Sequence, residues 1–500
     1  MADRLEKRVS HGETSEIMKA EEDIAHEEDV FAHGQTDFSE ERLALEKKLK
    51  RKIDARMGIL IIIYILNYID RNNASAAKSR GFVKDLKLDD TQYSTCLSIL
   101  YVGYILMQVP SNAIVQLTGR PSIYLPICMT IWGLISILTG VTHNFIGALL
   151  TRFFLGFVEA AFFPGALFLL SKWYKKDELG VRYTMLYCGS LISGAFGPLM
   201  AAGILGNMEG KLGVRAWRWL FYIEGALTIA FALISVFVLP ATTDFPHNTR
   251  GLTQAERDLA VLRIQEDSNG VKDTADGGED AHSMLEGVKM ALADPQVWLI
   301  AFSMASIVLG LSFNAFFPQI SKTLGYSNTV TLLLCAPPFV FATIVSFANA
   351  RHSDATGERY WHIVGPLCFG AIGFIISMAT TKTAARYVAM FLMAGSYAGF
   401  VVCLTWITTS FPKPAMKRAT AIAFVNAFGQ LGNIAGSYIY RAPWAPKYLP
   451  TFAISLAAYA VGIAGWTVHL FIQKRKNARI IAAENAGEES GYAKGFRFPL

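Results

Sequence analysis

Twelve long apolar runs dominate this chain of 500 residues and restrict its fold more than any other feature. A helix needs about 20 mostly apolar residues to cross the hydrocarbon core of a bilayer. The sequence therefore predicts twelve transmembrane helices, or eleven if the ninth and tenth runs form one. The runs are 57–77, 92–117, 122–141, 145–171, 180–205, 217–239, 296–320, 329–350, 361–380, 386–410, 418–440 and 451–473.

Charged residues gather outside these runs. They make up 17% of the chain, against about a quarter of an ordinary globular protein. Of the 86 charges, 51 lie in residues 1–56, 240–294 and 474–500, and the other 362 residues hold 35. This segregation excludes a soluble multidomain protein. The net charge of +6 comes from clusters beside the apolar runs, so we predict a bilayer environment and no nucleic-acid partner.

The chain divides into six runs on each side of the polar stretch 240–294. We expect a largely disordered N-terminal tail (1–56), a first half (57–239), a linker (240–294), a second half (295–473) and a C-terminal tail (474–500). Within the linker, residues 253–267 are amphipathic and predict a short helix. Basic residues crowd 47–56 and 474–479, which places both tails and the linker in the cytoplasm. The expected fold class is an all-α, multi-pass membrane protein in the plasma membrane.

The turn after the second run and the turn after the eighth run are similar. The first contains Gly119 and Arg120, and the second contains Asp354, Gly357 and Arg359. Aligning the two glycines gives an offset of 238 residues, which also carries the start of the first run onto the start of the seventh. The chain is therefore predicted to contain two equivalent halves.

Two six-helix halves with a Gly–Arg turn after the second helix of each resemble the major facilitator superfamily. The resemblance implies a structural or gating role for Gly119, Arg120, Asp354, Gly357 and Arg359. The strings NYIDRNN (67–73), RFFLGFVEA (152–160) and WRWLF (217–221) look like its anion:cation symporter branch. They are most similar to the fungal allantoate permease-like group, which includes permeases for nicotinate, pantothenate, biotin and ureido acids.

Few charged residues lie inside the runs, and an ionised side chain at mid-membrane costs about 2.5–3.5 kcal/mol. At 1.5 Å per residue, Asp70, Arg71 and Arg152 share one depth, and Glu159 lies about two turns away on the face of Arg152. An arginine can bind a carboxylate bidentately, and a partly buried carboxylate can titrate. The resemblance implies that Asp70 and Glu159 handle protons, whereas Arg71 and Arg152 bind and gate the anion. Static salt bridges between the first and fourth helices are the alternative.

Other candidates are polar or aromatic. In the second half, Asn314, Trp406 and Asn426 are candidate substrate contacts, although such residues also serve as packing or as hydrogen bonds between helices. Glu224 in the sixth run is expected to be structural or gating. The six cysteines lie in apolar runs without a CxxC pair, so neither a metal nor a cofactor is predicted.

The expected function is proton-coupled uptake of a small organic anion by a secondary transporter that works as a monomer. Three alternatives are weighed against it. The chain contains no P-loop, HExxH or GxSxG motif, which argues against an enzyme. A transporter of this fold can also export a secondary metabolite or xenobiotic, and a nutrient sensor can keep the fold without transport.

Overall fold

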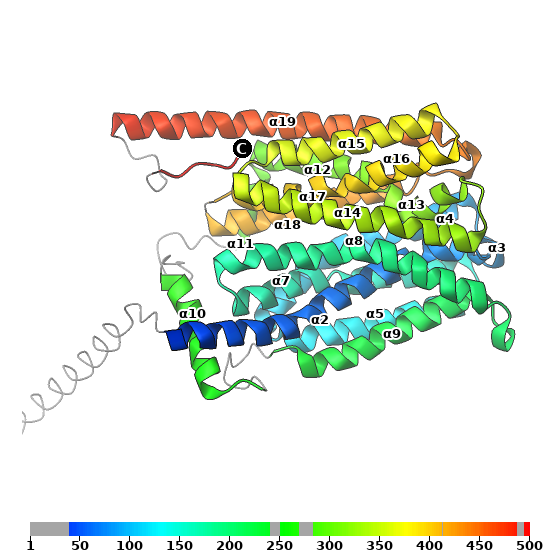
Figure 1. Ribbon diagram of the computed structural model, residues 1–500, viewed down its shortest axis with the longest axis horizontal. Coiled ribbons are helices and arrows are strands. Elements are labelled where there is room, and N and C mark those ends of the chain that lie inside the picture. The colour runs from blue at the N-terminus through cyan, green and yellow to red at the C-terminus, as the bar shows by residue number, and fades with distance from the viewer. Residues whose placement is uncertain (1–39, 241–250, 270–283, 413, 488–494) are drawn as a thin grey trace, which may run out of the picture.

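The computed structural model describes residues 40–240, 251–269, 284–412, 414–487 and 495–500. Helices run side by side in one bundle, and each of the twelve predicted runs falls on one helix or on two consecutive helices (Figure 1). No strand occurs in the described residues. The predicted fold class, an all-α protein of twelve membrane helices, is confirmed.

The first half contains six rods: α2 (Glu40–Lys78), α4 (Asp90–Thr118), α5 (Pro121–Val141), α6 (Phe145–Glu159) with α7 (Phe162–Trp173), α8 (Lys176–Asn207) and α9 (Ala216–Val238). The second half contains α12 (Pro295–Leu311) with α13 (Phe313–Lys322), α14 (Asn328–Thr356), α15 (Tyr360–Ala379), α16 (Thr383–Gly395) with α17 (Tyr397–Ser410), α18 (Ala415–Gly436) and α19 (Leu449–Ala486). Short helices α3 (Phe82–Asp85), α10 (Gln254–Asn269) and α11 (Met284–Leu292) connect them.

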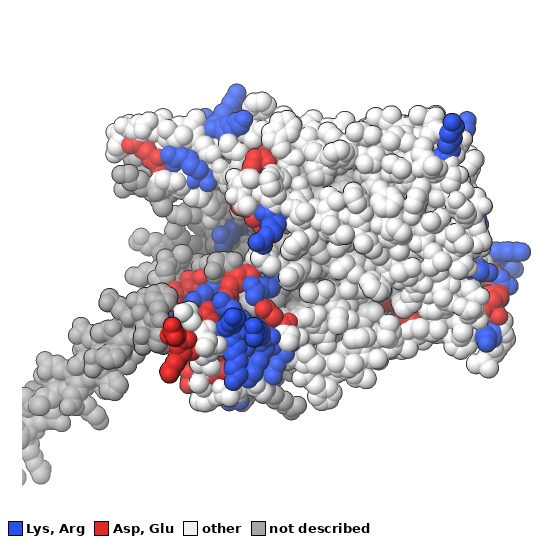
Figure 2. Space-filling model, viewed as in Figure 1, with Lys and Arg blue, Asp and Glu red and all other residues white. Residues whose placement is uncertain are grey.

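Nine of the rods in the described residues are long and apolar enough to cross a membrane. The other three, α2, α4 and α18, are not among these nine. The face seen in Figure 2 is mostly uncharged between two charged ends, as a bilayer requires. We call the end that holds α10 and the start of α2 the tail end, and the opposite end the loop end.

Two helices extend beyond their apolar runs. Helix α2 begins at Glu40, inside the predicted N-terminal tail, and α19 continues to Ala486, inside the predicted C-terminal tail. Charged residues one turn apart stabilise such extensions, as Glu46 and Lys50 do at 3.0 Å. Part of each predicted tail is therefore helical.

The internal repeat appears in the helix ends. Gly119 ends α4 and Gly357 ends α14, both with positive φ (59° and 68°). Glycine adopts this left-handed conformation without steric cost. The 238-residue offset carries the bounds of α4 onto those of α14. Across the bundle, α4 packs on α18 and α8 packs on α14, two pairs that the same offset relates.

Polar contacts join the two halves at the loop end. Lys78 Nζ donates to Gln319 Oε1 at 3.3 Å, and Asn328 Nδ2 donates to the carbonyl oxygen of Ser79 at 3.2 Å. The Tyr438 hydroxyl lies 3.1 Å from a hydroxyl of α4. The halves therefore meet closely at this end.

Charged side chains of both signs gather at the tail end (Figure 2). Ion pairs bind helix α10 to the first half there. Buried Arg263 lies 2.6 Å from Glu178 of α8 and 3.0 Å from Glu46 of α2, and Lys52 lies 2.7 Å from Glu256. Burial acts to raise the pKa of Glu256, but the bond from Lys52 and the Thr253 amide outweigh it and hold that pKa below its usual value. The lowered pKa keeps this contact intact at neutral pH, and the contact weakens only as the pH falls into the acid range.

Candidate functional site

Three of the rods are interrupted, and each interruption places a polar residue near the centre of the bundle. Glu159 is the last residue of α6, Asn314 is the second residue of α13 and Tyr397 is the first residue of α17. Because a break frees side chains from the regular helical stripe, these three residues can face the seam between the halves.

Arg71 of α2 and Glu159 of α6 form a buried ion pair. The Arg71 Nε and Nη2 atoms both lie 2.9 Å from Glu159 Oε2. The side chains are 8% and 0% exposed. The other carboxylate oxygen, Oε1, is also buried and receives no hydrogen bond from Arg71. Arg71 is therefore bound through one of the two oxygens.

Aromatic rings surround the Arg71 guanidinium. Its carbon lies 4.8 Å from the centre of the Tyr68 ring, 5.0 Å from that of Tyr104 and 5.9 Å from that of Tyr101. The negative faces of such rings attract a cation. The rings thereby hold the Arg71 guanidinium at the interface between the two halves.

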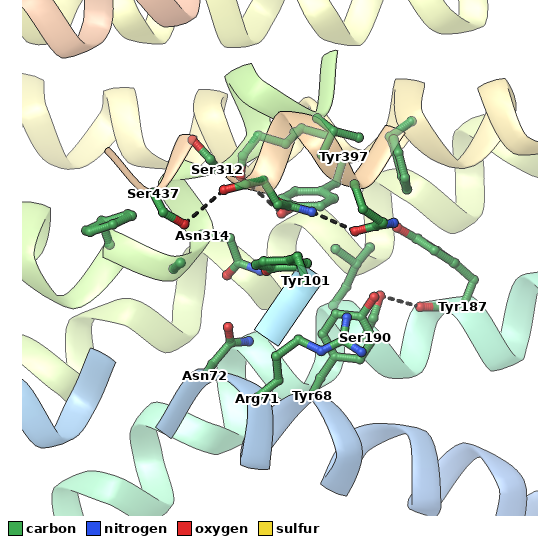
Figure 3. A pocket seen from close by; sticks show the side chains of 18 residues that line it. Tyr68, Arg71, Asn72, Tyr101, Tyr187, Ser190, Ser312, Asn314, Tyr397 and Ser437 are labelled. Atoms are coloured by element: carbon green, nitrogen blue, oxygen red, sulfur yellow. Dashed lines mark hydrogen bonds between the residues drawn. The ribbon is translucent and has the colours of Figure 1, made fainter. Parts of the chain in front are cut away.

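A cavity lies between the two halves, with about 730 Å³ of empty space when the open solvent at its mouth is included. Figure 3 shows Arg71 and Tyr68 reaching into it from α2, with Asn314 and Tyr397 on the opposite wall. Arg71 is charged, and the other lining residues that the structure describes are uncharged. The lining combines aromatic rings with a few amide and hydroxyl groups, as sites for small molecules do. The lining is Tyr68, Arg71, Asn72, Tyr101, Tyr187, Ser190, Leu191, Val308, Leu311, Ser312, Asn314, Ala315, Phe316, Tyr397, Phe400, Gln430, Asn433 and Ser437.

Arg152 lies behind Arg71 and does not line this cavity. Its guanidinium donates to the carbonyl oxygens of Asp70 (3.2 Å) and Arg71 (2.5 Å) and to Asn73 Oδ1 (3.3 Å). The shared depth inferred from the sequence agrees with these contacts. Arg152 therefore fixes the α2 backbone that carries the other charged residues.

The Asp70 carboxylate points away from the cavity. It accepts hydrogen bonds from Ser136 Oγ of α5 at 2.8 Å and from Thr228 Oγ1 of α9 at 2.7 Å. It is fully buried. The structure thus brings Asp70, Arg71, Arg152 and Glu159 together, but only Arg71 of the four lines the cavity.

The other predicted substrate contacts lie in different places. Asn314 lines the cavity, whereas Asn426 of α18 does not, and Gln430 and Asn433 of the same helix do. Trp406 is fully buried outside the lining, where its ring stacks on Trp466 at 5.1 Å. The roles of Asn426 and Trp406 in substrate binding stay predictions.

The predicted turn residues lie at the tail end. Arg359 Nη1 lies 2.6 Å from Asp354 Oδ1 and 3.0 Å from Ser353 Oγ. This ion pair ties the end of α14 to the start of α15. Gly119 ends α4, and Arg120, which follows it, is exposed.

Sequence reasoning missed four tyrosines of the lining: Tyr68, Tyr101, Tyr187 and Tyr397. Among the residues that the structure describes, no group of three His, Cys, Asp or Glu side chains is placed to hold a metal ion. The site therefore consists of one cation, one paired carboxylate and neutral polar or aromatic side chains.

Comparisons with known proteins agree on one family. The model of the Major Facilitator Superfamily matches residues 60–437. The "MFS-type transporter cnsO" of Penicillium expansum is 34% identical over 475 residues, which cover 92% of this chain and 89% of that protein. The "Major facilitator-type transporter hxnP" of Emericella nidulans is 28% identical, with 84% of each chain covered.

Solved structures show the same fold at low identity. A D-xylose-proton symporter superposes with a TM-score of 0.59 and 14% identity, covering 81% of this chain and 96% of the symporter. A bacterial homologue of the human lysosomal transporter Spinster superposes with a TM-score of 0.61 and 17% identity, covering 82% and 95%.

Proposed function

Because this chain belongs to the major facilitator superfamily and is therefore a membrane transporter, we propose that it carries a small organic anion together with protons. The observation that carries the proposal is the Arg71–Glu159 ion pair, whose arginine lines the central cavity. An arginine in such a cavity offers a carboxylate substrate two parallel charged hydrogen bonds. The surrounding tyrosines and amides accommodate the rest of a small substrate.

The ion pair also suggests how anion and proton binding are linked. A substrate carboxylate that binds Arg71 competes with Glu159 for the same N–H groups. Once displaced, an ionised Glu159 is a buried charge without its partner, which costs several kcal/mol. Taking up a proton removes this cost. Substrate and proton therefore bind together, which is the requirement for symport.

Asp70 and Arg152 are proposed to support this step. Asp70 joins α2 to α5 and α9 through two hydroxyl groups, so a change in its protonation alters how α2 packs in the first half. Arg152 holds the α2 carbonyls on either side of the pair. We propose that it is a positioning residue for the anion site.

The finer assignments follow the resemblance to the allantoate permease-like group. We propose uptake of a carboxylate vitamin, ureido acid or related nutrient, by a monomer in the plasma membrane with both tails and the linker in the cytoplasm. An inward proton gradient drives symport into the cell. The proposal is tested against two alternatives. One is export of the substrate by antiport, and the other is a sensor that does not transport.

The test is uptake of labelled carboxylates into proteoliposomes with an imposed pH gradient. We expect the wild-type protein to concentrate one member of the panel, and Glu159→Gln to lose accumulation while it still exchanges substrate for substrate. Glu41→Gln, which alters an exposed carboxylate at the start of α2, is the matched control. A wild-type protein that transports but ignores the gradient contradicts symport. A Glu159→Gln variant that still concentrates substrate in response to the gradient contradicts the coupling role.

A further inference from the structure

A second cavity, of about 440 Å³, lies on the loop-end side of the central one. Asn72 and Asn314 line both cavities, so the two are adjacent. Helices α2, α8 and α9 supply the wall on one side, and Phe317 and Phe339 of the second half supply the other. The cavity therefore lies on the seam where the halves meet.

Glu224 of α9 lines this cavity and has no ion-pair partner among the described residues. Glu224 is 2% exposed, and the polar side chain that interacts with it is that of Asn73, which is neutral. A buried carboxyl group that lines a cavity and has no cation to compensate its charge is a candidate proton-binding group.

The charge of the surroundings favours a proton. None of the described lining residues of the second cavity is a lysine, arginine or histidine. An ionised carboxylate buried without a cation is very unfavourable. Among the buried ionisable groups around α2, two arginines (Arg71 and Arg152) face three carboxyl groups (Asp70, Glu159 and Glu224). One proton makes this set neutral. Glu159 pairs with Arg71, and Asp70 accepts hydrogen bonds from two hydroxyl groups. Among the described residues, Glu224 has neither an ion pair nor a hydroxyl donor.

Contacts connect Glu224 to the anion site. The Asn73 side chain interacts with Glu224, and Asn73 Oδ1 accepts a hydrogen bond from Arg152. Arg152 in turn binds the carbonyl oxygen of Arg71. A change at Glu224 can therefore reach the arginine that faces the central cavity.

The seam around Glu224 is also the place that alternating access must open. The Phe339 ring lies on the backbone of Gly194 so closely that a Cβ at Gly194 would stand 2.6 Å from a ring carbon. Because glycine has no side chain, the contact at this point is between a ring and the backbone of Gly194. When the halves separate at the loop end, this cavity opens to water. Hydration then lowers the free-energy cost of ionising Glu224.

We propose that Glu224 is a second proton-binding site, which is loaded from the loop end and closed when the halves meet. The inference rests on the proposed transport function, and it adds one coupled proton to each cycle. Closure is possible only with the carboxyl group neutral. Transport of substrate into the cell would then carry this proton inward with the anion.

The test compares Glu224→Gln, Glu224→Asp and wild type in proteoliposomes, with the steady-state accumulation of a labelled carboxylate measured at pH gradients of zero to two units. Each coupled proton changes the accumulation ratio about tenfold per pH unit. Gln mimics the protonated acid, so we expect Glu224→Gln to keep substrate exchange but to lose about tenfold in accumulation per pH unit. Glu224→Asp, which can still titrate, should keep most of the gradient dependence. Glu41→Gln is the control for a general effect of removing a carboxylate.

Accumulation by Glu224→Gln at the wild-type level would overturn the proposal, because the proton on Glu224 would then be a permanent part of the fold. Loss of exchange in Glu224→Gln would overturn it as well, because the neutral form is expected to close normally. Accumulation that follows a sodium gradient in wild type but not in Glu224→Gln would make this a cation site instead. A wild-type protein that ignores the pH gradient would refute the symport function itself, which separates the two failures.

Discussion

Replacing Arg71 with Lys tests whether the central cavity binds a carboxylate through the geometry of arginine. Arg71 uses two N–H groups on one oxygen of Glu159 and lies near three tyrosine rings. Lysine keeps the positive charge but presents it as a compact ammonium group. It can neither form the planar pair of bonds nor stack on the rings in the same way.

The size of the effect follows from these contacts. Lysine would give a substrate carboxylate one directed charged hydrogen bond in place of two. One such bond contributes about 1.5–3 kcal/mol, and each 1.4 kcal/mol corresponds to about a tenfold change in affinity. We therefore expect the apparent affinity for the substrate to fall about ten- to a hundredfold. Glu159 keeps a cationic partner, so the fold should survive.

The assay is concentration-dependent uptake into proteoliposomes, with thermal unfolding of the purified protein as the measure of folding. Arg51→Lys is the matched control, because Arg51 is exposed and lies 20 residues before Arg71 on α2, about 30 Å along the helix. We expect the control to transport normally. An Arg71→Lys protein with unchanged apparent affinity across the carboxylate panel would refute the bidentate anion site.

Three further predictions concern topology and packing. A cysteine introduced at Asn269 should react with an impermeant reagent only after cells are permeabilised, and reaction in intact cells would invert the proposed orientation. Gly156→Ala should sharply lower the yield and the unfolding temperature, because a Cβ there would stand 1.9 Å from the backbone oxygen of Leu100. The control is Gly203→Ala, whose Cβ would meet no atom within 4 Å and which should therefore be close to neutral. Equal stability of the two variants would contradict this packing. Arg263→Met should lower the unfolding free energy by about 1–3 kcal/mol, since it leaves buried carboxylates short of a donor, and an unchanged melting curve would show that α10 contributes nothing to stability.

The sequence predicted how deep the charged residues lie in the membrane, but it did not predict which neighbouring helix each side chain faces. Apolar length predicted the rods, and counting 1.5 Å per residue placed Asp70, Arg71 and Arg152 at one level. Consecutive residues of a helix point about 100° apart, so Asp70 and Arg71 cannot face the same neighbour. Which of the two faces the cavity depends on the rotation of α2 against α5 and α9, and this rotation is a property of tertiary packing.

The missed cavity residues have a similar explanation. The sequence analysis named Asn426 but not Gln430 or Asn433, which line the cavity. The three recur at the spacing of one helix face, and the depth of each along α18 is not encoded in that spacing. Tyrosines are common in both cores and binding sites, so no local pattern marks Tyr187 or Tyr397 as lining. Trp406 looked suitable by type, yet it packs against Trp466.

The unequal distribution of charge between the two walls of the central cavity has an evolutionary consequence. The described residues that the second half contributes are all uncharged, among them Ser312, Asn314, Gln430 and Asn433, and the charged member of the lining belongs to the first half. Mutations in α12, α13 and α18 can therefore change which molecule fits without altering the ion pair to which we assign the coupling. Under the proposed function, gene duplication followed by drift in the second half gives descendants of this protein a route to new substrates that keeps the inherited ion pair.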